Sequence, residues 1–182
     1  MSVIAAFLLV SATAPTIATS SHAESAAASQ SVHELVVQAP RSAVWQAVST
    51  SAGWTGWAAT KAWSLPGEAD VIETSYDPKA ARGAPANIKS RIVLKVPERL
   101  LAFRTIKAPE GFADFEALTA VTWVIELEPA ADGATRVRLT GSGFPRTAAG
   151  RRIQDFFLAH NPVALKSLSD RFTATGTANA AK

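Results

Sequence analysis

The chain has 182 residues, of which 18 are basic and 15 acidic, and it contains no cysteine. This length favours one domain, and the near balance of charges, with no long basic run, argues against a nucleic-acid partner. The lack of cysteine excludes disulfides, thiolate catalysis, cysteine-based metal sites and a lipid anchor on an N-terminal cysteine.

The N-terminus predicts export. Residues 1–23 contain no Asp, Glu, Lys or Arg, and residues 4–10 form a short apolar run. Ser21 and Ala23 place small side chains at the −3 and −1 positions of a cleavage site, so we expect a signal peptide cut after Ala23. The run is shorter than the roughly 20 apolar residues of a membrane span, so no stable membrane anchor is expected. The basic residue usual before such a run is missing, so either the α-amino group supplies that charge or translation starts upstream.

The mature chain is expected to be secreted or periplasmic and to hold one domain. Residues 24–31 are small and polar and read as a flexible linker. The domain is predicted over residues 32–174, and residues 175–182 are predicted to be a disordered tail.

The domain opens with an extended segment, a proline junction and two helices. Residues 32–38 are extended, and Pro40 suits a helix start because its missing N–H would have no partner there. Residues 41–50 then carry an apolar stripe at helical spacing. A second short helical segment carries Trp54 and Trp57.

The middle of the chain has the pattern of antiparallel strands. Residues 61–66 carry Trp63 and end in a Pro-Gly turn, and strands are predicted over residues 70–76, 87–96, 99–106, 119–128 and 135–140. Residues 77–85 read as a loop, residues 107–118 as an insertion and residues 129–133 as a hairpin turn. In residues 87–96 the alternation predicts one buried face, made of Ile88, Ser90, Ile92, Leu94 and Val96.

The period changes to 3.6 after Pro145. One predicted stripe holds Ile153, Phe156, Phe157 and His160, and a second holds Ala164, Leu165, Leu168 and Phe172. Between them, Asn161 resembles a helix cap and Pro162 a first helical residue. We therefore expect a long C-terminal helix that is broken or kinked at Asn161.

This order of elements predicts an α+β fold. A curved antiparallel β-sheet wraps around the long C-terminal α-helix, and two short helices follow the first strand. The helix must bury its aromatic stripe, and the inner face of the sheet is the large partner it has. Space left between them is the expected pocket.

The segment APRSAVWQAVS, residues 39–49, resembles the opening motif of the SRPBCC superfamily, the helix-grip fold of START domains, polyketide cyclases and pollen-allergen-like proteins. It is nearest to the branch related to activators of the large heat-shock ATPase chaperone, and residues 97–103 add weaker support. The resemblance covers residues 31–174. It implies a helix-grip fold with a hydrophobic cavity, but no single reaction.

Aromatic side chains are the leading candidates for a ligand site. They either line an apolar pocket or belong to an ordinary core, because aromatics dominate core burial in any case. Phe112 and Phe115, in the insertion, are candidates for a lid. The predicted ligand-binding residues are Trp54, Trp57, Trp63, Phe112, Phe115, Trp123, Phe144, Phe156 and His160.

Acid–base candidates are few. His160 and Glu73 are candidates for an acid–base group in the pocket. The alternative for His160 is a structural histidine at the helix break, and the inward face of the strand at residues 70–76 is undetermined. His33 is expected at the surface, and Glu126 and Glu128 are expected to face solvent. No metal-ligand spacing is present, so neither a metal nor a cofactor is expected. Residues 140–143, TGSG, lack the rest of a phosphate-binding loop and read as a strand-to-helix turn.

The function predicted from these features is binding of a small hydrophobic or amphipathic molecule, lipids included, by an exported monomer. Two alternatives stay open. One is a cyclase- or hydrolase-like enzyme that works in the same cavity, and the other is a protein-interaction module of the chaperone-activator type, against which the export signal argues.

Overall fold

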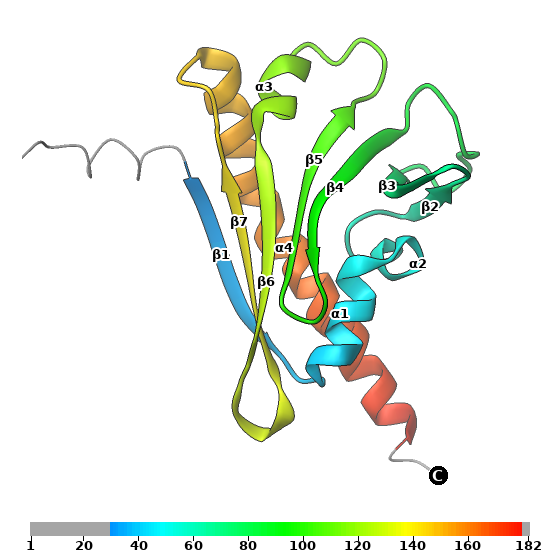
Figure 1. Cartoon of the computed structure of the whole chain (residues 1–182), viewed down its shortest axis with the longest axis vertical. Coiled ribbons are helices and arrows are strands. Elements are labelled where there is room, and N and C mark those ends of the chain that lie inside the picture. The colour runs from blue at the N-terminus through cyan, green and yellow to red at the C-terminus, as the bar shows by residue number, and fades with distance from the viewer. Residues whose placement is uncertain (1–29, 180–182) are drawn as a thin grey trace, which may run out of the picture.

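A seven-stranded antiparallel sheet and one long helix build the fold (Figure 1). The computed structural model describes residues 30–179. The strand order is β1-β7-β6-β5-β4-β3-β2, and α4 (Ala148–Asn179) runs across one face of the sheet (Figure 1). The strands are β1 (Gln30–Val37), β2 (Lys61–Leu65), β3 (Glu68–Ser75), β4 (Ile88–Val96), β5 (Leu100–Lys107), β6 (Thr122–Pro129) and β7 (Thr135–Ser142). The predicted α+β helix-grip architecture is confirmed.

The strand–proline–helix unit forms as predicted. Pro40 precedes α1 (Arg41–Ser49) with φ −59°, and α1 buries Val44, Trp45, Ala47 and Val48. The Thr50 hydroxyl then caps α2 (Ser51–Trp54) by accepting a hydrogen bond from the Gly53 backbone N–H at 2.9 Å. Strand β1 begins at Gln30, so the last two residues assigned to the linker belong to the sheet.

The meander of β5, β6 and β7 is also confirmed. Trp123, Ile125 and Leu127 of β6 are buried together, while Glu126 and Glu128 lie on the other face. The hairpin before β7 turns through Asp132 and Gly133, which both have positive φ. The alternation predicted this part well because one face of the sheet packs against the core and the other meets water.

The prediction for β4 is wrong over its second half. The register with β5 shifts between Ile92 and Leu94, and a bulge of this kind turns later side chains away from the expected face. Leu94 and Val96, which the alternation placed on the buried face, are consequently 51% and 36% exposed. A period-2 pattern cannot reveal this shift, because the bulge depends on how two strands pair.

Two short elements were missed in the sequence. Residues 61–65 form the edge strand β2, which pairs with β3 through a hairpin at Pro66 and Gly67. Part of the predicted insertion folds as α3 (Phe115–Ala120), so β6 begins at Thr122. Both elements are short, and short elements depend on packing more than on propensity.

Helix α4 is continuous from Ala148 to Asn179 with Pro162 inside it, so the long C-terminal helix is confirmed and a break at Asn161 is wrong, while the alternative of a kink there stays a prediction. An interior proline removes a helical hydrogen bond and costs about 3 kcal/mol. Burial of Ile153, Leu165 and Leu168 offsets this cost. In the part of the chain that the structure describes, no helix combines the length and apolarity needed to cross a bilayer.

Gly141 of β7 leaves room for the ring of Trp123 on the neighbouring strand, where the two residues face each other. A Cβ atom at Gly141 would lie 2.5 Å from Trp123 Cζ3 and 2.9 Å from the Ser31 hydroxyl. Gly141 is therefore required for packing within β7, and the strand-to-helix turn predicted for residues 140–143 is wrong for residues 140–142, which belong to this strand.

We expect Gly141→Ala to lower the free energy of unfolding by about 1–3 kcal/mol, because it overpacks the core at Trp123. Urea unfolding of Gly141→Ala, Trp123→Leu and the double variant measures this. The double variant should be more stable than the sum of the single effects, since the smaller side chain removes the clash. Simple additivity would contradict this explanation.

Candidate functional site

A cavity of about 150 Å³ lies between the inner face of the sheet and α4. Side chains from β3 to β7, from α3 and α4, and from the segment after α1 surround it. The apolar ones are Trp54, Trp57, Ala58, Ile88, Phe103, Leu118, Trp123, Ile125, Leu139, Phe157 and Ala164. The predicted pocket between sheet and helix is therefore present, and it is small.

Two aromatic pairs form neighbouring parts of its wall, since Phe103 of β5 pairs with Trp123 of β6. The rings of Trp54 and Phe103 lie 5.0 Å apart at 64°, and those of Trp123 and Phe157 lie 4.4 Å apart at 57°. The Trp54 and Trp57 indole N–H groups donate to the carbonyls of Val48 and Ala47 at 2.6 and 3.0 Å. With these donors satisfied by α1, the two indoles are held in place and offer apolar surface to the cavity.

The polar side chains of the cavity are uncharged. Thr74, Ser90 and Thr105 come from three adjacent strands, and Ser90 faces Thr105 directly across β4 and β5. Asn161 comes from α4, is 7% exposed, and has a buried Nδ2 without a hydrogen-bond partner. Tyr76 stands at the mouth with its side chain 69% exposed.

Three of the predicted ligand-binding residues, Trp54, Trp57 and Trp123, line this cavity. The structure places the other predicted residues elsewhere. Phe144 packs edge-on behind Trp123 at 5.9 Å. Phe112 and Phe115 are each 39% exposed, before and at the start of α3. The ring of Trp63 is half-buried on the edge strand β2.

Phe156 and His160 lie on the outer side of α4, where both are exposed. His160 Nδ1 lies 2.7 Å from the Phe156 carbonyl oxygen, and its ring stacks on Phe156 at 4.0 Å. The residues that do reach the cavity are Phe157, Asn161 and Ala164. Their i, i+4, i+7 spacing is the signal that could have found them, and the assumed break at Asn161 concealed it.

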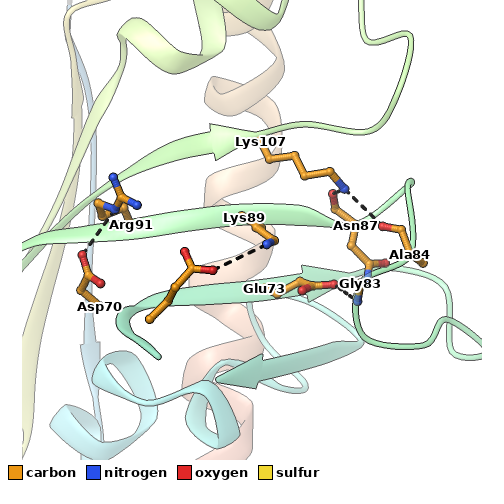
Figure 2. Close-up of polar contacts among 9 residues, drawn as sticks. Asp70, Glu73, Gly83, Ala84, Asn87, Lys89, Arg91 and Lys107 are labelled. Carbon is orange, nitrogen blue, oxygen red and sulfur yellow. Dashed lines mark hydrogen bonds and ion pairs between the residues drawn. The ribbon is translucent and has the colours of Figure 1, made fainter. Parts of the chain in front are cut away.

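Glu73 lies on the face of β3 opposite to the cavity. Ile72 packs in the core and Thr74 lines the cavity, so the alternation directs Glu73 the other way. Its side chain is nevertheless buried, at 1% exposed, beneath the loop of residues 77–87. Its Oε1 accepts hydrogen bonds from the Gly83 backbone N–H and the Asn87 side-chain amide, each at 2.5 Å (Figure 2).

Lys107 also binds this loop, and we call the contacts of Glu73, Asn87 and Lys107 with residues 77–87 the latch. Its ammonium group donates to the carbonyls of Ala84, Pro85 and Asn87 at 3.0 to 3.2 Å. Figure 2 shows Glu73, Asn87 and Lys107 gathered at one end of three neighbouring strands. The loop is flanked by Tyr76 and Ile88, which both line the cavity. Glu73 therefore holds the loop beside the cavity mouth instead of acting within the cavity.

His33, expected at the surface, is half-buried on β1. It shares the inner face of β1 with the buried Ser31 and Val37, and its Nε2 is buried without a hydrogen-bond partner. It pairs with Leu139, which lines the cavity. Desolvation lowers the pKa of His33 below its ordinary value of 6.5, so the imidazole is neutral at pH 7.

Asp114 and Arg152 tie α3 to α4. Two hydrogen bonds of 2.6 and 2.9 Å join the Arg152 guanidinium to the Asp114 carboxylate. These bonds hold the pKa of Asp114 below its ordinary range and raise that of Arg152. The pair positions α3, which contributes Leu118 to the cavity.

A larger depression of about 550 Å³ lies between α2 and the diverging ends of β3 and β4. It is an open groove whose wall includes the exposed Asp70, Val93 and Leu94, so a ligand there would stay in contact with solvent.

Among residues 30–179, no group of three or more His, Cys, Asp and Glu side chains could hold a metal ion.

Comparison with solved structures identifies the fold. Protein MLL2253 from Mesorhizobium loti is 18% identical, with a TM-score of 0.61 over 80% of this chain and 98% of that one. The Aha1 dimer from Colwellia psychrerythraea is 17% identical, with a TM-score of 0.58 over 78% and 93%. The di-domain ARO/CYC protein BexL from the BE-7585A biosynthetic pathway is 18% identical, with a TM-score of 0.58 over 78% and 45%.

These likenesses show that the chain has the helix-grip fold, as its resemblance to the SRPBCC superfamily implies. No protein-family model and no curated protein sequence matches the chain. At these identities the comparisons establish architecture, and the function has to be argued from the cavity itself.

We expect Lys107→Met to lower the free energy of unfolding by about 1–3 kcal/mol, because three loop carbonyls lose a charged donor. Hydrogen exchange in residues 77–87 should become faster. Lys89→Met is the matched control, because Lys89 makes only a 4.0 Å contact with the partly exposed Glu68, a kind of ion pair that contributes little. Equal effects of the two substitutions would contradict the latch.

We expect the free energy of unfolding to fall as the pH decreases below about 6.5, in part because of His33. Its folded pKa is depressed, so the unfolded chain binds the proton more tightly in this range and acidification favours unfolding. Urea unfolding between about pH 7.5 and about pH 5.5 should show that the free energy of unfolding depends less steeply on pH in His33→Gln than in the wild type. If His33→Gln keeps the full slope, the imidazole is not desolvated.

Proposed function

We propose that this helix-grip domain binds a small hydrophobic or amphipathic molecule in the cavity between the sheet and α4. One observation carries the proposal: the fold leaves an apolar space in its centre, walled by fixed aromatic rings. Ligand sites are concave and mostly apolar, with a few placed polar groups, and this cavity has that composition.

The side chains that line the cavity favour binding over catalysis. Among the described residues that line it, none is Asp, Glu, His, Lys or Arg. His160 is outside on α4, and Glu73 is held under the loop at residues 77–87. A cyclase or hydrolase mechanism in this cavity would have to begin from hydroxyl and amide groups, which are weak acids and bases without a charged partner.

The protein-interaction alternative has less support. It rests on the resemblance of residues 39–49 to chaperone activators and on the fold shared with the Aha1 dimer. In this chain the corresponding helix α1 faces inward, since Val44, Trp45, Ala47 and Val48 are buried and its carbonyls hold the cavity tryptophans. We therefore attribute the motif to the architecture of the cavity.

Export belongs to the same proposal. The signal peptide predicted over residues 1–23 lies outside the described residues, so secreted or periplasmic location and the cut after Ala23 remain sequence predictions. So does the monomeric state. N-terminal sequencing of the mature protein and its native mass address these points directly.

We expect Ala164→Phe to weaken ligand binding by about tenfold or more, because a ring from α4 would occupy the cavity. The probes are neutral aromatics of one to three rings and fatty acids. Binding is measured by the change in tryptophan fluorescence, to which Trp54 and Trp123 in the cavity wall contribute.

The matched control is Ala159→Phe, at an exposed position of the same helix, which should bind as the wild type does. If no probe binds the wild type, or if both variants lose binding equally, the cavity is not the site.

A further inference from the structure

We infer that the ligand is a neutral compound of about one aromatic ring that carries a hydrogen-bond acceptor, such as a carbonyl oxygen, for Asn161. This inference rests on the proposed function and deepens it. It follows from three properties of the cavity: its size, its lack of charge, and one polar side chain that the protein leaves unsatisfied.

Size sets the number of rings. The cavity measures about 150 Å³, and an engineered protein cavity of about this volume accommodates benzene. Sites for drug-sized ligands start at about 300 Å³. The walls are held by the hydrogen bonds of Trp54 and Trp57 to α1, so expansion to several fused rings would displace anchored residues.

Charge sets the ionisation state of the ligand. The lining residues described here include no ionised side chain. A carboxylate or ammonium group buried there would lose its hydration without gaining an ionic partner, at a cost of several kcal/mol per ion. The ligand that fits is therefore neutral.

Asn161 sets the polar group. It is buried in the middle of the α4 stripe, lines the cavity, and its Nδ2 has no partner. An unsatisfied buried donor destabilises a protein by about 1–3 kcal/mol, so an apolar residue would serve a purely structural position better. The terminal torsion of asparagine is broad, which lets the amide turn toward a bound acceptor.

The opposite wall is compatible with the same group. Thr74, Ser90 and Thr105 lie on the cavity face of β3, β4 and β5, while the aromatic residues Trp123 and Phe157 come from β6 and α4. Ile88 and Phe103 lie on the same strands as Ser90 and Thr105, so apolar and hydroxyl side chains share this wall. A one-ring ligand can place its ring against the aromatics and its acceptor either at the Asn161 amide or at one of these hydroxyls.

The test compares acetophenone with ethylbenzene, which has nearly the same shape but no acceptor. We expect the wild type to bind acetophenone about tenfold more tightly, because only acetophenone satisfies the Asn161 amide. In Asn161→Leu this preference should shrink to about threefold or less, while ethylbenzene binds at least as well as before. Thr105→Val is a second variant that keeps its side-chain shape and should reduce the preference without affecting ethylbenzene.

His160→Leu, one residue away on the exposed side of α4, is the matched control and should keep the wild-type preference. Benzoate and 2-acetylnaphthalene should each bind at least about tenfold more weakly than acetophenone, for reasons of charge and of size. All affinities can be measured by calorimetry on the full mature chain, with melting temperatures to confirm folding.

The outcomes separate this inference from the proposed function. If ethylbenzene and acetophenone bind equally to the wild type, or if Asn161→Leu keeps the full preference, the acceptor inference is overturned and the cavity function stands. Tight binding of benzoate overturns the neutral ligand, and tighter binding of 2-acetylnaphthalene overturns the one-ring limit. If the wild type binds none of the four compounds and also none of the wider panel, the proposed function fails.

Discussion

The structure depends on the burial of one long helix against the concave face of a sheet. The helix does not completely fill the space inside that face. Helix α4 buries Ile153, Leu165 and Leu168 almost fully. The sheet contributes the buried residues Ile125, Val137 and Leu139. At roughly 1.5–3 kcal/mol for each fully buried aliphatic side chain, this contact outweighs the helical hydrogen bond lost at Pro162. Where Asn161 and Ala164 stand in the stripe, smaller side chains leave the cavity between helix and sheet.

Elements distant in sequence hold the cavity open. The first helix fixes two tryptophans through its own carbonyls, so their N–H groups need no partner inside the cavity. Helix α3 is tied to α4 by Asp114 and Arg152. On the outer face, Glu73, Asn87 and Lys107 hold the loop that begins and ends beside the cavity mouth. These polar contacts lie outside the cavity and leave its interior uncharged.

The unsatisfied polar atoms are informative because proteins rarely leave them. Most buried donors and acceptors have partners, yet in the described part of the chain the amide nitrogen of Asn161 and the imidazole Nε2 of His33 have none, as is also true of Ser31 Oγ, Glu73 Oε2 and Asn87 Oδ1. Asn161 and His33 both lie on inward-facing surfaces of the sheet–helix core. Asn161 lines the cavity, so its unsatisfied amide destabilises the empty protein and can be satisfied by a bound ligand. In His33, desolvation lowers the pKa of the imidazole.

The sequence by itself determined the architecture and the apolar character of the site. Period-2 runs for β6 and β7, the proline junction before α1 and the 3.6 period of α4 are local signals, and the structure confirms them. Tertiary structure decided which side chains meet in the cavity. The bulge in β4, the inward face of β3 and the helical phase across Pro162 depend on pairing between distant strands and on burial of the whole helix. No local pattern encodes those energies, so Glu73 and His160 could look catalytic in the sequence, while Phe157 and Asn161 are the residues that reach the cavity.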